Sequence, residues 1–290
     1  MRNIAIIMIP GILLCGHTQA DDSPATPAPL SAEAILNGHN RERALAKLPA
    51  FKLSKPLSDA ALVHAKDMAK QKTLKHEGTD GSTPFDRIKA ASYHYQAAAE
   101  NVARGQTTVE DVMRDWMKSP HHRENIVADY LEIGVAVVAD DDGQYFWCVD
   151  FGKPWPDMAS ADAEAEVIDL INQERSKAGK KPLRLEPKLA KAAAWQASFT
   201  AGGSVVDAQD PKKTDVFEKI KEMDLKYKTV AQTGAEGLAT PRDLVKYWLE
   251  QPDYRKTLLE DFKDAGAGYS KDKEGRPHWC LLLGKALTGK

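Results

Sequence analysis

The stretch that decides the fold is WMKSPHHRENI, which occupies residues 116–126. Its Ser119-Pro120 pair predicts a turn that leads into a helix, because a residue before proline avoids helical angles and proline suits the first helical position. The stretch therefore places two imidazoles, those of His121 and His122, beside the start of a short helix.

Two shorter motifs upstream carry further polar side chains. LKHEG contains His76, and AAENV contains Glu100 and Asn101. If the fold brings His76 and Glu100 to His122, the three form a polar cavity with titratable groups. The ordered set LKH, AENxA, WxxSPxHRxNI, IGVA and FG resembles the bacterial members of the CAP superfamily (SCP domains), which also contains the cysteine-rich secretory, antigen 5 and pathogenesis-related 1 proteins. The resemblance covers residues 31–153 closely.

The pattern of apolar residues predicts an α/β domain. Helical periodicity and capping residues predict three helices, which begin at Ser31, at about 58 and at about 108. The resemblance adds a short helix over 84–91. Strands are expected near 93–98 and over 133–139 and 145–151, the last two as a hairpin. Helices on both faces of such a sheet make a three-layer α-β-α sandwich, which the resemblance also implies.

The same pattern returns in the second half of the chain. Many residues recur at one offset (172 − 40 = 132): Asn40/Asn172, Arg43/Arg175, Leu57/Leu189, Ala65/Ala197, Trp116/Trp248, Pro120/Pro252, Arg123/Arg255, Gly134/Gly266, Cys148/Cys280 and Gly152/Gly284. Around Glu100 we expect the offset to change (236 − 100 = 136), which pairs Glu100 with Glu236 and Asn101 with Gly237. The sequence therefore predicts two tandem copies of one fold.

The second copy is expected to be degenerate. Its histidine positions hold other residues: Ala208 for His76, Asp253 for His121 and Tyr254 for His122. Only the acid, Glu236, is expected to survive. We therefore predict a structural or partner-binding role for the second copy.

The resemblance implies that His76, His122 and Glu100 line a cavity in the first copy, with Asn101 beside them. The second acid of the animal and plant members has no counterpart after Trp116. Two imidazoles and a carboxylate are the ligands of an open zinc site, so a divalent cation is one expectation for a cofactor. The alternative is that Glu100 holds the histidines by hydrogen bonds. Asn101 is expected to bond nearby backbone.

Residues that recur in both copies are expected to be structural. They are Asn40, Arg43, Arg123, Trp116 and their counterparts. His121 is expected to face solvent at the mouth of the cavity.

The sequence favours a non-enzymatic binding protein over an enzyme. No GxSxG elbow or catalytic-cysteine signature is present, and Ser119 is explained as a turn residue. The reported ligands of the family are sterols, lipids and divalent ions, so a small or lipidic ligand or an envelope protein is the expected partner. Two alternatives stay open: a metal-assisted or serine-type hydrolase that uses His76, Glu100 and His122, and a protein–protein interaction module.

Composition and the N-terminus define the class of protein. With 42% hydrophobic residues, 28% charged residues and a net charge of -2, the chain of 290 residues is of the soluble globular class and gives no reason to expect nucleic acid as a partner. Residues 1–20 resemble a signal peptide cleaved after Ala20, which predicts a periplasmic or extracellular protein without a later membrane span. A retained anchor and a lipid on Cys15 are the less favoured alternatives. The expected segments are 1–20 (signal peptide), 21–30 (linker), 31–153 (first domain), 154–163 (linker) and 164–287 (second domain).

Two cysteines remain after such a cleavage, Cys148 and Cys280. An oxidising compartment would permit a disulfide between them. Because they occupy equivalent places in two similar strands, we expect each thiol to be buried in its own domain and unpaired.

Overall fold

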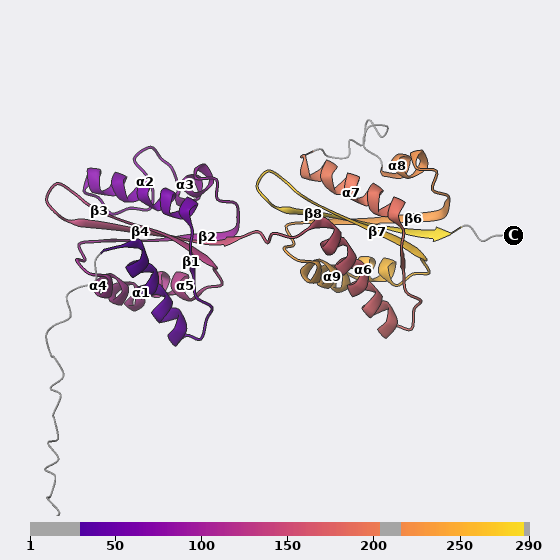
Figure 1. Cartoon of the computed structure of the whole chain (residues 1–290), viewed down its shortest axis with the longest axis horizontal. Coiled ribbons are helices and arrows are strands. Elements are labelled where there is room, and N and C mark those ends of the chain that lie inside the picture. Colours follow the sequence, from indigo (N-terminus) through magenta and orange to yellow (C-terminus); the bar gives the residue numbers. More distant parts are fainter. Residues whose placement is uncertain (1–29, 204–215, 287–290) are drawn as a thin grey trace, which may run out of the picture.

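The computed structural model describes residues 30–203 and 216–286, which form two α/β repeats joined by a short connection (Figure 1). The first repeat consists of α1 (Ala32–Leu45), β1 (Lys52–Leu53), α2 (Lys55–Gln71), α3 (Pro84–Ala90), β2 (Tyr95–Arg104), α4 (Val109–Lys118), α5 (Pro120–Val127), β3 (Glu132–Ala139) and β4 (Tyr145–Pro154). The second consists of α6 (Ser160–Lys177), β5 (Arg184–Leu185), α7 (Pro187–Ala201), α8 (Val216–Glu222), β6 (Tyr227–Glu236), α9 (Pro241–Glu250), α10 (Pro252–Leu258), β7 (Asp264–Lys271) and β8 (Pro277–Ala286).

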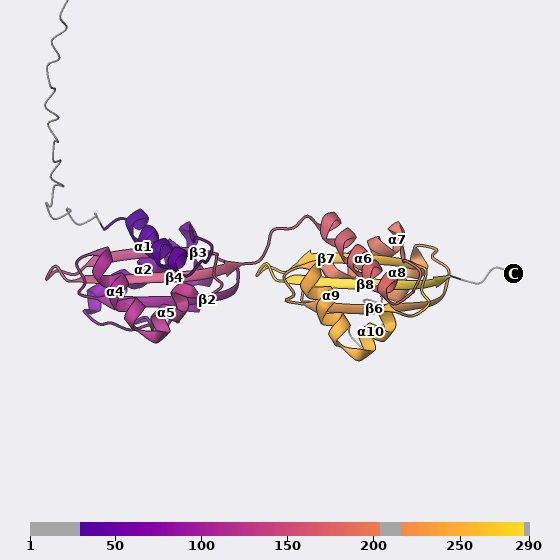
Figure 2. The ribbon, with the colours of Figure 1, turned by 90° about the horizontal axis from the view of Figure 1, so that it is seen from below.

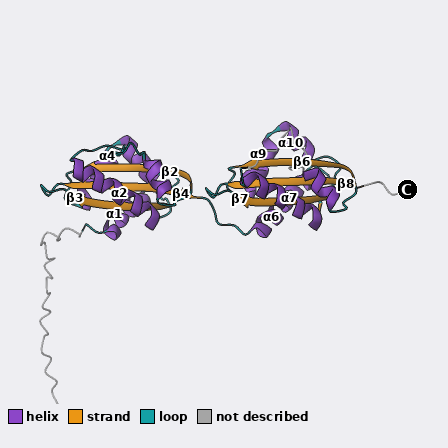
Figure 3. Cartoon of the chain, turned by 90° about the horizontal axis from the view of Figure 1, so that it is seen from above, coloured by secondary structure: helices purple, strands orange, loops and turns teal. Residues whose placement is uncertain are grey.

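Each repeat is a three-layer sandwich, as predicted. The strand orders are β1-β3-β4-β2 and β5-β7-β8-β6, with only the two-residue first strand of each sheet parallel to its neighbour. In the first repeat α2 and α3 cover one face of the sheet, and α1, α4 and α5 cover the other (Figures 1 and 2). Figure 3 looks onto the sheets of both repeats, with the helices in purple and the strands in orange.

Helices begin where capping residues occur in the sequence. The Ser31 hydroxyl accepts from the Ala34 N–H at the start of α1, and the Thr108 hydroxyl accepts from the Asp111 N–H at the start of α4. Pro120 opens α5 directly after Ser119, whose side chain makes no capping bond. The predicted turn into a helix is therefore confirmed, and proline rather than a serine cap defines it.

Alternation along β4 divides the core of the first repeat between the two faces of the sheet. Phe146 and Cys148 pack against α2, whereas Trp147, Val149 and Phe151 pack among α1, α4 and α5. Successive strand side chains point to opposite faces, so one apolar run serves both layers. Cys148 and Cys280 are both buried and unpaired, as expected.

The two sheets have the same register throughout, which corrects one prediction. Glu100 pairs with Asp150 across β2 and β4, and Gln232 pairs with Leu282 at the same point of β6 and β8. The offset of 132 thus holds at Glu100 (232 − 100 = 132), and the expected match with Glu236 is wrong. Both strands have ten residues, so neither contains an insertion. The local similarity between AEN (residues 99–101) and AEG (residues 235–237) is therefore not a structural equivalence.

The constant offset also corrects the residue that is equivalent to Asn101 in the second repeat. Its counterpart is Thr233, in the middle of β6, and not Gly237, which lies beyond the end of that strand. Glu236 occupies the position of Arg104. No carboxylate of the first-repeat set is therefore kept in the second repeat at its equivalent strand position.

One buried arginine in each repeat ties the first helix to the loop before the central hairpin. Arg43 donates to the carbonyl oxygens of Pro49, Ile126, Ala128 and Tyr130 at 2.6–3.3 Å. Arg175 makes the equivalent four bonds in the second repeat. The structural role expected for this pair is confirmed. Arg123, in contrast, is exposed and makes no side-chain hydrogen bond or ion pair within the described residues.

Several predicted segments fall outside the described residues. They are the signal peptide (1–20), nearly all of the first linker (21–30) and Ala208, the counterpart of His76. The second linker is shorter than expected, because α6 already begins at Ser160. Among the helices that the structure describes, none combines the length and apolar character needed to cross a membrane.

Candidate functional site

Glu100 is the centre of a buried polar network in the first repeat. It lies on β2, the edge strand, and is only 7% exposed. Its Oε1 accepts from His76 Nδ1 at 2.8 Å, and its Oε2 accepts from Arg87 Nη2 at 2.7 Å and from the Cys148 thiol at 3.3 Å. Burial alone would raise the pKa of Glu100, but the His76 hydrogen bond and the charges of His64 and Arg87 outweigh it and lower the pKa. Glu100 is thus held as a carboxylate.

His76 lies in the loop between α2 and α3, with its side chain 55% exposed. Arg87 donates to its backbone oxygen at 3.0 Å and so fixes the loop. The hydrogen bond to Glu100 raises the pKa of His76. Because Nδ1 faces Glu100, Nε2 is the ring nitrogen left for a ligand.

His122 reaches the same edge of the sheet from α5, on the other layer. Asn101, which is fully buried, donates to the His122 backbone oxygen at 3.0 Å and accepts from Asn125 Nδ2 at 2.8 Å. Burial and the nearby charges of His76 and His121 lower the pKa of His122, which favours the neutral ring. Asn101 therefore bonds backbone, as predicted, and positions His122.

The structure brings some of the predicted residues together and separates others. His76 and Glu100 are in direct contact, and the charge of His76 contributes to the lowered pKa of His122. Asn101 lies on the opposite face of β2 from Glu100, and among the described residues its side chain hydrogen-bonds with α5 alone. His121 is exposed, as expected.

Four residues of the network were not predicted from the sequence. They are His64, Arg87, Cys148 (assigned to the core only) and Asp150. Asp150 lies opposite Glu100 in the β2–β4 ladder and is 1% exposed, and neither of its oxygens has a hydrogen-bond partner among the described residues. Burial and the charge of Glu100 raise its pKa well above the usual value, which favours the protonated acid. An acid inside the apolar run FWCVDFG was the available signal.

The buried acids themselves do not fit a cation. Ligand atoms of Glu100, Cys148 and Asp150 lie within 4.8 Å of one another. However, burial raises the pKa of the Cys148 thiol, as it does that of Asp150, and Arg87 already occupies a Glu100 oxygen. Metal ligands must be deprotonated, so this trio suits a hydrogen-bonded network.

In the described residues of the second repeat, only Cys280, the counterpart of Cys148, is kept from this network. The counterparts at the offset of 132 are Gln196 for His64, Lys219 for Arg87, Gln232 for Glu100, Tyr254 for His122 and Leu282 for Asp150. The loss of the site that the sequence predicted thus extends to all the charged partners of Glu100.

Comparison with known proteins agrees with this organisation. The model of the Cysteine-rich secretory protein family (CAP) matches residues 36–151 and again 168–283. The uncharacterized protein YkwD of Bacillus subtilis is 34% identical over 126 residues, which is 42% of this chain and 49% of YkwD. The chain thus spans about half the length of this curated relative.

Solved structures give weaker matches. An outer surface protein from Borrelia burgdorferi is 24% identical with a TM-score of 0.40, over 42% of this chain and 91% of that one. An extracellular SCP-domain protein from Bacillus anthracis is 24% identical with a TM-score of 0.38, over 42% of this chain and 39% of that one. Because both scores lie below 0.5, it is the family match that identifies the protein. The chain belongs to the Cysteine-rich secretory protein family, or CAP, and carries two copies of its domain in tandem.

Proposed function

We propose that the protein is a non-enzymatic binding protein that works outside the cytoplasm and whose first repeat binds a divalent cation through His76 and His122. The observation that carries the proposal is the bond of 2.8 Å between His76 Nδ1 and the buried carboxylate of Glu100. Histidines that bind metals commonly donate their other ring N–H to a carboxylate in this way, which fixes the tautomer and the ring.

The chemistry of the two histidines supports the proposal. His76 offers Nε2, and His122, whose lowered pKa favours the neutral ring, offers the form that binds metal. Glu100 would orient His76 rather than bind the ion, because both of its oxygens are already engaged. Bound there, zinc would supply an open coordination position for a small polar ligand.

A serine hydrolase has less support. The Ser119 hydroxyl makes no hydrogen bond to a histidine within the described part of the chain, and its place at the start of α5 is explained by the turn.

Export from the cytoplasm is supported by residues 1–20 alone, and N-terminal sequencing of the protein released by cells would test it.

Zinc titration by isothermal calorimetry tests the cation site. We expect wild type to bind one zinc ion and the double variant His76→Ala, His122→Ala to bind at least about 100-fold more weakly. Glu100→Gln, which keeps a hydrogen-bond acceptor but loses the charge, should weaken binding by about 10-fold or more.

The second repeat provides the matched control. His278→Phe removes a histidine from that repeat, and we chose phenylalanine because Phe146 occupies the equivalent position in the first repeat. This variant should bind zinc as wild type does. Equal, weak binding by wild type and the double variant would remove the cation from the proposal.

A further inference from the structure

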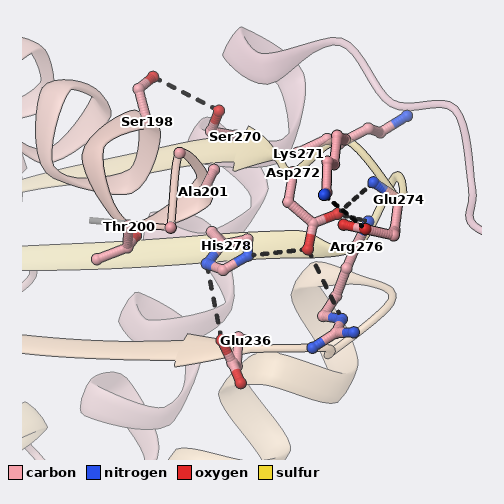
Figure 4. A pocket seen from close by; sticks show the side chains of 13 residues that line it. Ser198, Thr200, Ala201, Glu236, Ser270, Lys271, Asp272, Glu274, Arg276 and His278 are labelled. Atoms are coloured by element: carbon pink, nitrogen blue, oxygen red, sulfur yellow. Dashed lines mark hydrogen bonds and ion pairs between the residues drawn. The ribbon is translucent and has the colours of Figure 1, made fainter. Parts of the chain in front are cut away.

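The second repeat contains a cavity of about 1000 Å³ at one end of its sheet, between the end of α7 and the β7–β8 turn (Figure 4). The constant offset identifies its counterpart in the first repeat, where larger side chains occupy the equivalent place beside β4. There Phe146 is 0% exposed and packs with Met68, and the Arg104 guanidinium lies 5.1 Å from the centre of the Phe146 ring.

Polar residues replace this filling in the second repeat. His278 occupies the position of Phe146, and Glu236 occupies that of Arg104, as the strand registers show. Thr200 stands for Met68, and Ser270 for Val138. Hydroxyl, imidazole and carboxylate groups thus replace an apolar and cation–π contact. They leave a hollow in which a few polar groups converge, which is typical of a binding site and not of a packed core.

The imidazole of His278 is held between two acids at the back of the cavity (Figure 4). Its Nε2 lies 3.4 Å from Asp272 Oδ2, and its Nδ1 lies 3.9 Å from Glu236 Oε2. Asp272 is itself fixed, because its Oδ1 accepts from the N–H groups of Glu274 and Arg276 at 3.0 and 2.8 Å. His278 is 7% exposed, so its ring is held in place and shielded from solvent, whereas Glu236 remains open to it.

The remaining charges favour a cationic ligand. The lysines at the rim are paired, Lys271 with Asp157 and Lys273 with Glu274, and Arg276 is paired with Asp272. Glu236 has no Lys or Arg partner among the described residues, and its side chain is 65% exposed. The wall opposite is the C-terminal end of α7, whose last carbonyl groups carry the negative end of the helix dipole.

We propose that this cavity binds a polar molecule through a protonated primary amine, with Glu236 as the counter-ion and His278 as a hydrogen-bonding partner. Polyamines, amino acids and amino sugars share this chemistry. The site is independent of the cation site in the first repeat.

Calorimetric titration of the full chain with putrescine, L-lysine and glucosamine tests the proposal, at concentrations up to about 10 mM so that a Kd near 1 mM is measured. We expect saturable binding of at least one amine, and the one that binds identifies the source. N-Acetylglucosamine, which lacks the ammonium group, should not bind. Absence of saturable binding for all three amines, or equal binding of N-acetylglucosamine and glucosamine, would overturn the proposal.

Two variants and a control complete the experiment. Glu236→Gln should weaken binding at least about tenfold, because it removes a charge-assisted bond at an exposed position with little cost to the fold. His278→Phe, which restores the first-repeat residue, should also weaken it. Asp169→Asn, an equal change of charge on the exposed face of α6 across the sheet, should leave affinity unchanged. Wild-type affinity in Glu236→Gln would exclude Glu236 as the counter-ion.

Discussion

At the residue scale, the contrast between Glu100 and Asp150 shows how burial is compensated in the first repeat. Glu100 receives three hydrogen bonds, two of them from the potentially cationic His76 and Arg87, and its pKa is lowered. Asp150 receives none from the described residues, and its pKa is raised. An uncompensated buried charge costs several kcal/mol, so the proton on Asp150 and the guanidinium beside Glu100 are two solutions to one problem. The second repeat avoids the problem with Gln232 and Leu282.

His39 is a further buried titratable group, and it lies away from the site. It is 0% exposed, packs against the rings of Trp116 and Phe151, and bonds the Ile35 carbonyl at 2.8 Å through Nδ1. Its Nε2 has no partner among the described residues. Burial lowers the pKa of His39 from 6.5 to about 4.

We predict that His39 makes the first repeat sensitive to acid. The unfolded chain takes up a proton below pH 6.5, whereas the folded protein does so only near pH 4, so the stability contributed at neutral pH is lost as the pH falls through this window. The loss amounts to about 3 kcal/mol. His39→Ile, which installs the residue found at the equivalent Ile171, should remove this part of the pH dependence in urea unfolding measured between pH 7 and pH 4. An unchanged slope in the variant would contradict the assignment.

At the element scale, β2 is an edge strand fastened on both faces at one point. Glu100 bonds the loop after α2, and its neighbour Asn101 bonds α5. In β6 the counterparts do not do this: Gln232 is exposed, and the buried hydroxyl of Thr233 has no partner among the described residues. Within the described residues, the edge strand is therefore fastened to both helical layers in the first repeat and not in the second.

Hydrogen exchange should report this difference. We expect the amides of β2 that pair with β4 to exchange at least about tenfold more slowly than those of β6 that pair with β8, because local opening of β2 must break the contacts to both helical layers. Asn101→Thr, which copies Thr233, should bring the β2 rates close to those of β6. Unaltered β2 protection in this variant would show that Asn101 does not fasten the edge.

The elements themselves could largely be predicted from the sequence, whereas the site could be predicted only in part. Capping residues and apolar periodicity are local signals, so the helix starts at Ser31 and Thr108 and the central hairpin were found. Arg87 was missed because its partner is 13 residues away and its position on a short helix resembles that of any surface arginine. Glu100 was wrongly paired with Glu236 because the hydrogen-bond register decides which strand residues are equivalent. This register cannot be read directly from the sequence.

At the scale of the whole molecule, the two repeats place polar groups at different points of the same framework. The first repeat has its charged network at Glu100 and Asp150, where the second has Gln232 and Leu282. The second repeat has its polar cavity at Glu236, four positions further along β6 (236 − 232 = 4). The description of the second copy as merely degenerate is therefore incomplete.

The paired arginines, Arg43 and Arg175, have a consequence for the chain as a whole. Each bonds backbone carbonyl oxygens of its own repeat only. No cluster of buried apolar residues in the described chain contains side chains from both repeats. The protein should therefore be modular, so that polypeptides cut between residues 157 and 158 each melt cooperatively in scanning calorimetry, with transitions that together reproduce the thermogram of the uncut chain. A half that stays random coil by circular dichroism when expressed alone would show that the halves lend each other stability after all.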